Sequence, residues 1–475
     1  MTRVASSTEH PRATLAAATL GSSLAFIDGS VVNVALPALA LDLHASPSGL
    51  PWAINAYLLP LGALMLLAGG LGDHYGRRRL FLVGLMIFTL ASVLCAVSPS
   101  LSSLLAARGL QGLGAALLMP NSLAILGSDF TGEARGRAIG TWAAVGALAS
   151  ALGPISGGWL IDKVGWRTIF LLNVPFAIAA GFLAWKYVRE RSDGKAAPID
   201  SVGAGLSTVG LGLLIWALTE ASGSTTASAF LWLAALSGTA ILGAFLRHER
   251  GLRDRALMPL AMFAVRSFAG LNLLTFFLYG SMGGLIVLLP FCLIRIEHWS
   301  AAAAGAALMP VPIVIAVGSR FMGRVASRHG ARLPLLAGCA LVGLGLALLT
   351  RFETGAISYW KDVLPPAMLI ALGMGACVAP LTTGVIESVA ADRVGIASGI
   401  NNAVARISGL IATASLGFVF ARQDSAAAFI VGFRVAALIG AASAVAAGAC
   451  ALLFVRRPAN PPGGVRPKSA RLPTA

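Results

Sequence analysis

The chain has 475 residues, of which 57% are hydrophobic and only 11% are charged, and its mean hydropathy is +0.83. Soluble domains carry about 25% charged residues to cover a hydrated surface. This composition therefore excludes a soluble globular protein and predicts an all-α polytopic membrane protein. The 55 glycines agree with that prediction, because small residues let membrane helices approach each other closely.

The formal net charge of +16 raises the question of a nucleic-acid partner, since basic patches neutralise phosphates. The basic residues instead fall in short clusters between apolar runs, as membrane orientation requires. No nucleic acid is therefore expected as a partner. The five cysteines lie in apolar stretches without CxxC spacing, and no two histidines are spaced as a ligand pair. We expect no disulfide framework, metal site or cofactor.

A membrane-spanning helix needs about 20 mainly apolar residues, and about fourteen such runs occur in the chain. Eight come first, near residues 14–36, 50–70, 80–98, 102–124, 137–161, 168–187, 201–219 and 229–246. Six more follow, near residues 268–294, 301–319, 333–350, 364–386, 394–420 and 429–455. Because this number is even, both termini are expected on the same side of the membrane.

The distribution of basic residues tests this layout through the positive-inside rule. With a cytoplasmic N-terminus, the inner segments hold 26 of the 35 basic residues and the outer segments hold 7. The remaining two, Arg108 and Arg406, lie inside helices. This bias predicts a multi-pass protein of the cytoplasmic membrane with both termini in the cytoplasm.

A weak internal repeat divides the chain into two halves. Residues 69–78 and residues 323–332 are separated by 254 positions, and both have glycines seven apart followed by basic residues. Two parallel halves are a known transporter design. We expect a cytoplasmic N-terminus (1–13), a six-helix bundle (14–187), a linker with two extra helices (188–265), a second six-helix bundle (266–455) and a cytoplasmic basic tail (456–475). The tail is interpreted as a solvated segment, with binding to anionic lipid headgroups as the alternative.

Five segments follow one another in the order of a known family. They are Asp28–Pro37 in the first helix, Gly69–Arg78 after the second, Arg108–Gly114 in the fourth, Gly153–Gly158 in the fifth, and Trp166–Pro175 at the start of the sixth. Together they resemble the major facilitator superfamily, in particular its fourteen-helix drug:proton antiporter branch. The resemblance covers nearly the whole chain. It implies two six-helix bundles with two extra linking helices, and exchange of a small molecule for protons.

Asp28 is the only carboxylate deep within a predicted helix, and an ionisable group at that depth is a functional hypothesis by default. It lies about 21 Å from the inner helix end, at 1.5 Å per residue. Arg108 lies at a similar depth in the fourth helix, which runs the other way. We expect the two to interact and to carry the coupling proton, since burial favours a neutral carboxyl and a guanidinium favours a charged one. A static ion pair is the competing interpretation.

Polar residues within the predicted helices are candidate substrate contacts: Asn33, Gln111, Asn401, Asn402 and Arg406. Hydrogen bonding between helices explains the asparagine pair equally well, and Arg406 has no evident acidic partner at its depth. The absence of a second deep carboxylate favours monocationic, zwitterionic or neutral amphiphiles over dications. Candidates for an adaptable apolar wall are Met119, Trp142, Phe276 and Phe277.

The segment 69–79 is expected to be a loop that gates the cytoplasmic side. Gly69 and Gly76 permit close helix contact and tight turns, Asp73 is expected to accept backbone hydrogen bonds at a helix start, and Arg77 to pair with Asp73 or with the opposite half. The resemblance implies that these contacts hold the cytoplasmic side closed. Simple topology anchoring by the arginines leaves the glycines and Asp73 unexplained.

The fifth helix carries the residues that resemble the antiporter motif: Gly153, Pro154, Gly157 and Gly158. Proline interrupts a helical hydrogen-bond ladder, and the glycines allow a neighbour to approach closely. We expect a bend or a seal near the outer face, with plain helix packing as an equal alternative.

The leading hypothesis is a proton-coupled antiporter that exports drug-like or amphipathic small molecules. The alternative is a dedicated exporter of a single endogenous metabolite or antibiotic. A membrane enzyme would need clustered His, Asp or Glu at the interface, and an ATP-driven pump would need a Gly-x-x-x-x-Gly-Lys-Ser/Thr loop; the sequence shows neither. The proton gradient is the expected energy source. Whether a periplasmic adaptor and an outer-membrane channel join the protein is left open.

Overall fold

The computed structural model describes residues 10–46, 48–190, 200–223, 228–252, 256–353, 357–390, 393–421 and 425–455. The expected basic tail, the first nine residues and linker residues 191–199 lie outside these ranges. In the described part, thirteen helices are long and apolar enough to cross a membrane, or fourteen if the bent α2 is counted as one span. The described residues contain helices and no strand. The predicted all-α polytopic architecture is confirmed.

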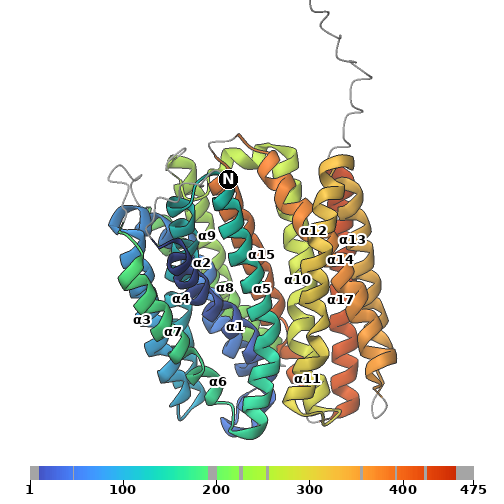
Figure 1. The fold of residues 1–475 in the computed structure, drawn as a ribbon. Helices are drawn as coiled ribbons and strands as arrows, with labels where there is room; N and C mark the ends of the chain where they lie inside the picture. Colours follow the sequence, from blue (N-terminus) through green and yellow to red (C-terminus); the bar gives the residue numbers. More distant parts are fainter. Residues whose placement is uncertain are drawn as a thin grey trace, which may run out of the picture.

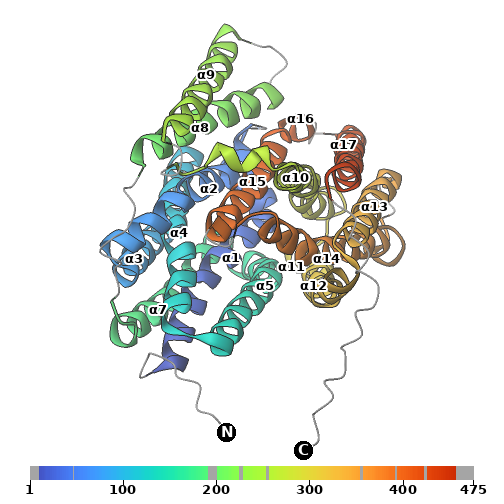
Figure 2. The same ribbon diagram turned by 90° about the horizontal axis from the view of Figure 1, so that it is seen from above.

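The first half of the chain forms one side of the molecule (blue to green in Figure 2). Its helices are α1 (Pro11–Asp42), α2 (Gly49–Tyr75), α3 (Arg77–Ala96), α4 (Leu101–Asp129), α5 (Gly132–Lys163), α6 (Thr168–Leu171) and α7 (Asn173–Tyr187). Local signals set several helix starts. Pro11 occupies the first turn of α1, where its missing N–H costs nothing. Ser100 and Ser103 form a capping box at the start of α4.

Two helices link the halves and lie at the edge of the molecule beside α2 (Figure 2). They are α8 (Ser201–Gly223) and α9 (Ala229–Leu252), which pack against each other. Asp200 Oδ1 accepts a hydrogen bond from Gly203 N (2.8 Å) and is hydrogen-bonded to His248 Nε2 (2.9 Å). The contact with His248 joins the start of α8 to the end of α9. Glu249 Oε2 accepts from Met258 N at 2.7 Å, which ties α9 to the segment before α10.

The second half forms the other side of the molecule. Its helices are α10 (Arg266–Arg295), α11 (Ala301–Leu308), α12 (Pro310–His329), α13 (Arg332–Leu348), α14 (Leu364–Glu387), α15 (Val394–Ala414), α16 (Gly417–Phe420) and α17 (Ala426–Phe454). Short single-turn helices lie at Leu260–Ala264, Leu349–Arg351 and Tyr359–Val363. Ser300 caps α11 and Ser425 caps α17 through their side-chain oxygens.

The sequence repeat recurs as the same backbone turn in both halves. Gly76 joins α2 to α3 with φ +106°, and Gly330 lies between α12 and α13 with φ +84°. Each N–H bonds the carbonyl four residues earlier, at 3.0 Å to Gly72 and 2.8 Å to Ala326. Positive φ at these two positions requires glycine, which explains why the repeat is recognisable there.

The prediction of a loop over residues 69–79 is wrong. Helix α2 continues to Tyr75 and α3 begins at Arg77, so Gly69 and Asp73 lie in the last turns of α2. Glycine costs about 1 kcal/mol in a helix, but tertiary packing overrides this preference. A β-carbon on Gly72 would collide with the side chain of Asn121 in α4, so the glycines let α2 and α4 approach closely.

Both ends of the described chain lie at one face of the molecule, the upper face in Figure 1, here called the terminal face. The His10 ring lies 5.0 Å from the Tyr187 ring at the end of α7. Arg332, at the start of α13, donates a hydrogen bond of 2.6 Å to the Leu452 carbonyl near the end of α17. The opposite face, where α6 and α11 lie (Figure 1), is called the far face.

The two halves meet along several helix contacts. Helix α1 packs against α10, α2 against α15, and α5 against both α11 and α12. Helices α1, α5, α10, α11, α12 and α14 surround a cavity between the halves, described below.

Candidate functional site

Asp28 and Arg108 are in direct contact inside the first half. Arg108 Nη1 donates hydrogen bonds to Asp28 Oδ2 and to Gln111 Oε1 (2.7 Å), and its Nε donates to the Ala53 carbonyl (3.1 Å). Asp28 is 0% exposed and Arg108 is 1% exposed. The contact that equal depth in antiparallel helices predicted is therefore present.

Three more polar side chains complete this buried network. Gln111 Nε2 donates to Asp28 Oδ1 (2.8 Å) and to Ser92 Oγ (2.9 Å). Asn173 Nδ2 donates to the same two oxygens, at 3.5 and 3.3 Å. Gln111, a candidate substrate contact from the sequence, is fully buried in the network and does not line the central cavity. Sequence reasoning missed Ser92, and recognised Asn173 only as part of a family signature.

Aromatic faces flank the Arg108 guanidinium. Its central carbon lies 4.4 Å from the Tyr57 ring centroid and 5.8 Å from that of Phe170. The Tyr57 hydroxyl donates to the Ala25 carbonyl at 3.1 Å. Since a desolvated guanidinium is stabilised by aromatic faces, Arg108 has several favourable contacts besides Asp28.

A central cavity of about 260 Å³ lies between the halves. Its polar side chains are Ser30, Asn33, Ser150 and Tyr279, and the remaining described lining residues are apolar, with no charged group among them. Asn33, another candidate substrate contact, lines this cavity. Helix α1 therefore carries Asn33 at the cavity and Asp28 in the buried network.

The three candidate substrate contacts on α15 have different environments. Asn401 Nδ2 donates to Thr275 Oγ1 (2.6 Å) and Asn272 Oδ1 (3.3 Å), and so joins α15 to α10. Asn402 is exposed and lines a second cavity of about 130 Å³ together with Tyr279. Arg406 makes no hydrogen bond or ion pair with any residue in the described ranges.

At the terminal face, Asp73 and Arg77 pair with each other. Arg77 Nε donates to Asp73 Oδ1 at 2.8 Å, and Nη2 lies 2.7 Å from the same oxygen. The expectation that Asp73 caps a helix start is wrong, because α2 extends past it. Glu190 caps α3 instead, accepting from the backbone N–H groups of Arg78 (3.2 Å) and Arg79 (3.1 Å).

The antiporter-motif residues lie at helix contacts. Helix α5 continues through Pro154 without a break. β-Carbons on Gly153 and Gly157 would collide with α1, and one on Gly158 would collide with the backbone of Ala301 in α11. In return, Gly305 of α11 lies against the Pro154 carbonyl. Two of the motif residues therefore form a close contact between the halves, near the far face.

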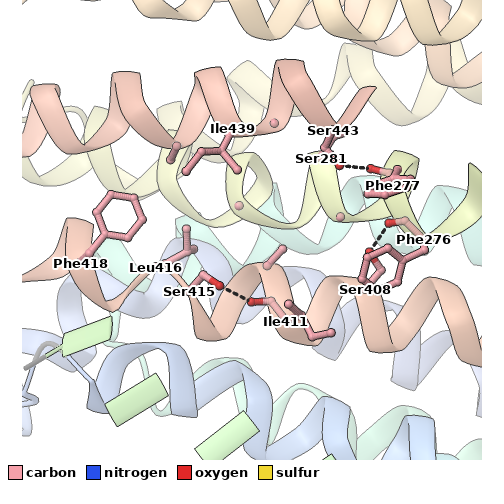
Figure 3. Close-up of a pocket in the computed structure, with 15 residues that line it drawn as sticks. Phe276, Phe277, Ser281, Ser408, Ile411, Ser415, Leu416, Phe418, Ile439 and Ser443 are labelled. Carbon is pink, nitrogen blue, oxygen red and sulfur yellow. Dashed lines mark hydrogen bonds between the residues drawn. The ribbon is translucent and has the colours of Figure 1, made fainter. Parts of the chain in front are cut away.

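A third pocket, of about 220 Å³, lies within the second half between α10, α15 and α17 (Figure 3). Phe276 and Phe277 line it, and neither they nor Met119 and Trp142 line the central cavity. Its serines donate to backbone carbonyls, for example Ser443 to Phe277 (2.8 Å) and Ser415 to Ile411 (2.8 Å) (Figure 3). Its walls are therefore largely apolar.

The family model described as Major Facilitator Superfamily matches residues 18–413 and 271–474. The chain belongs to the major facilitator superfamily. Multidrug resistance protein Stp of Mycobacterium tuberculosis is 34% identical over 418 residues, covering 87% of this chain and 76% of that protein. Drug efflux pump JefA of the same species is 32% identical, covering 88% and 82%. The tetracenomycin C resistance and export protein of Streptomyces glaucescens is 33% identical, covering 87% and 76%. The predicted membership of the superfamily's multidrug efflux transporters is confirmed.

Solved transporter structures share the fold of this chain. A peptide transporter structure with bound sulfate superposes with a TM-score of 0.68 and 15% identity, covering 94% of each chain. A proton-dependent oligopeptide transporter gives 0.63 and 15%, covering 93% of this chain and 97% of the other. At this identity the similarity concerns the fold alone.

Proposed function

We propose that this transporter exports amphipathic small molecules across the cytoplasmic membrane in exchange for protons. The observation that carries the proposal is the Asp28 carboxylate, fully buried in a polar network inside a membrane-spanning helix bundle. An ionisable group at that depth is costly and is retained where it serves a pathway or a proton relay. Asp28 and Arg108 are the proposed coupling pair.

The network suits a reversible proton site because Arg108 has hydrogen-bond acceptors whether Asp28 is charged or neutral. With Asp28 charged, Arg108, Gln111 and Asn173 all donate to it. With Asp28 neutral, Arg108 keeps the Gln111 and Ala53 oxygens as acceptors, together with its aromatic neighbours. A buried charge that loses its only partner is strongly destabilising, and here that penalty is reduced.

Coupling to the substrate runs through α1. Asp28 does not line the central cavity, whereas Asn33, about 7.5 Å further along the same helix, does. Direct competition between a cationic substrate and the proton for Asp28 does not fit this arrangement. We propose that loss or gain of the proton shifts α1 relative to α4, and that this shift changes the cavity wall.

The central cavity favours an amphipathic cargo. About 260 Å³ of space approaches the lower end of the range for small-molecule sites. Apolar walls with a few hydroxyl and amide groups bind the apolar surface of a substrate and tolerate substrates of different shapes. This is the basis for proposing a broad range of drug-like substrates.

We assign closure of the terminal face to the motif at residues 69–79 and closure of the far face to the motif at Gly153–Gly158. Close packing of Gly158 on Ala301 holds the far face shut. Asp73 and Arg77, with Gly69 and Gly76 beside them, are proposed to close the terminal face when the halves rock. This follows the rigid-body logic of transporters built from two repeats.

The proposed orientation of the protein in the membrane rests on the positions of its arginines. The turns at Gly76 and Gly330, with their flanking arginines, lie at the terminal face, and by the positive-inside rule this supports a cytoplasmic terminal face. The named relatives are resistance and efflux proteins, which supports outward transport. Lipid, protons and the cargo are the proposed partners.

A dedicated exporter of one endogenous metabolite or antibiotic is the second candidate. It is favoured by relatives whose names specify single compounds, such as the tetracenomycin C export protein and the puromycin resistance protein of Streptomyces alboniger. Substrate breadth separates the two candidates.

The test is substrate-driven proton movement in everted membrane vesicles, with a panel of cationic, zwitterionic and neutral amphiphiles. Substrate-induced loss of the pH gradient is expected with the unaltered protein and is expected to disappear in Asp28→Asn. Asp42→Asn, the same change at the exposed end of α1, is the control, because its ion pair with Arg167 is about half exposed and contributes little. Full proton exchange in Asp28→Asn would refute the coupling role, and a response to one compound class alone would favour the dedicated exporter.

A further inference from the structure

Arg406 is a membrane-embedded cation whose guanidinium is not paired within the described ranges. Val394 begins α15, so Arg406 lies about 18 Å along the helix, near the middle of the membrane. A charged side chain at this depth is expensive and almost always faces a partner or a cavity. The missing partner is therefore the feature that requires an explanation.

The side chain lies where the two halves meet. A β-carbon on Gly62 of α2 would lie 3.5 Å from Cβ and 3.9 Å from Cδ of Arg406, so the aliphatic stem rests on α2 while the side chain remains partly exposed. The guanidinium is within electrostatic range of Tyr57 on α2 and Tyr279 on α10. Tyr279 lines both the central and the second cavity, and Ala405, the neighbour of Arg406 in α15, lines the second cavity.

Arg108 shows by contrast what a satisfied guanidinium requires in this protein. It has Asp28, Gln111 and the Ala53 carbonyl as acceptors. The Asp28–Arg108 pair is neutral overall, so Arg406 adds one uncompensated positive charge at a similar depth. The second cavity beside it presents hydroxyl and amide groups, including Thr382 and Asn402, but no carboxylate among its described lining residues.

We propose that Arg406 binds an acidic group on the transported molecule, a carboxylate or a comparable planar anion. The guanidinium fork matches such groups with two parallel hydrogen bonds, and Tyr279 and Asn402 offer further polar contacts beside it. The inference rests on the proposed export function and narrows its substrate class. The preferred cargo is an amphipathic acid or zwitterion whose apolar part occupies the central cavity.

Equilibrium binding to the full-length chain in lipid nanodiscs tests the proposal, with empty nanodiscs subtracted. The probes are 1-pyrenebutyrate and its methyl ester, which differ only in the acidic group. The unaltered protein is expected to bind the acid at least about tenfold more tightly than the ester, as one charge-assisted interaction of about 1.5–3 kcal/mol predicts. Arg406→Gln is expected to lose this preference without changing ester binding, and Arg406→Lys to keep part of it. Arg320→Gln, at an exposed position of α12, should change neither.

Equal affinity of the unaltered protein for acid and ester would overturn the proposal. This comparison does not depend on whether any variant folds. An acid preference that survives intact in Arg406→Gln would also overturn it, and would point to another cation. The vesicle assay separates this inference from the proposed function. Proton exchange without acid preference refutes the Arg406 site alone, whereas acid preference without proton exchange refutes the coupling and leaves the site standing.

Discussion

Asp162, at the far end of α5, accepts a hydrogen bond from the backbone N–H of Ala301 at the start of α11. The distance is 3.0 Å, and its second oxygen accepts from Ala302 at 2.9 Å. A carboxylate at a helix N-terminus is favoured by the unpaired N–H groups and by the helix dipole. Since the two helices belong to different halves, this contact must break for the far face to open.

Replacing Asp162 with Asn should weaken closure of the far face. The amide keeps one acceptor oxygen but loses the negative charge, and charge-assisted hydrogen bonds contribute about 1.5–3 kcal/mol. Labelling of a Ser30→Cys reporter in the central cavity by a membrane-impermeant maleimide, added from the far-face side, should become about tenfold faster. The native cysteines are all buried. Lys163→Gln is the neighbouring control, and equal labelling rates in all three proteins would contradict the assignment.

Gly158→Ala should impair transport without preventing membrane insertion. The added methyl would collide with the Ala301 backbone, which cannot move aside as a flexible side chain could. We expect transport below about a tenth of the unaltered rate, since a misplacement of about 1 Å suffices to disrupt a close-packed contact. Gly140→Ala is the matched control, because a β-carbon at that position of α5 meets nothing within 4 Å. Equal transport by the two variants would show that the contact is not part of the closed state.

Arg108→Gln should lower thermal stability more than the double variant Asp28→Asn/Arg108→Gln. The single change leaves a buried carboxylate without its cation, which costs about 3–5 kcal/mol, whereas neutralising both partners removes the uncompensated charge. The unfolding temperatures of the purified proteins, measured in one detergent, give the order of their stabilities. Arg167→Gln, which removes a half-exposed ion pair, should cost less than about 1 kcal/mol. A double variant less stable than Arg108→Gln would contradict this account.

Gly76→Ala should destabilise the turn between α2 and α3. Its φ of +106° strains any residue with a β-carbon, and the new methyl would collide with Glu190, which caps α3. A cost of about 1–3 kcal/mol is expected, visible as a lower unfolding temperature. Gly70→Ala, where a β-carbon meets nothing within 4 Å, should be neutral; similar losses in both would indicate a general effect of altering this segment.

The apolar runs of the sequence were sufficient to predict the helices, because the bilayer requires spans of a fixed minimum length whatever their neighbours. The depth of Asp28 and Arg108 could also be calculated from the sequence, since helical rise is constant and the two helices run in opposite directions. The turn glycines Gly76 and Gly330 were visible because a positive φ restricts the residue type locally.

Side-chain partners were decided only by the tertiary structure. Gln111 and Asn173 turn toward Asp28 rather than toward a cargo, Phe276 faces a pocket inside one half, and α2 runs through its glycines to Tyr75 because α4 packs closely there. Nothing in the local sequence distinguishes a polar side chain that meets another helix from one that meets a cavity. That distinction depends on the rotation and contact of helices far apart in the chain. The same packing gives Arg108 three hydrogen-bond acceptors and leaves Arg406 with none among the described residues.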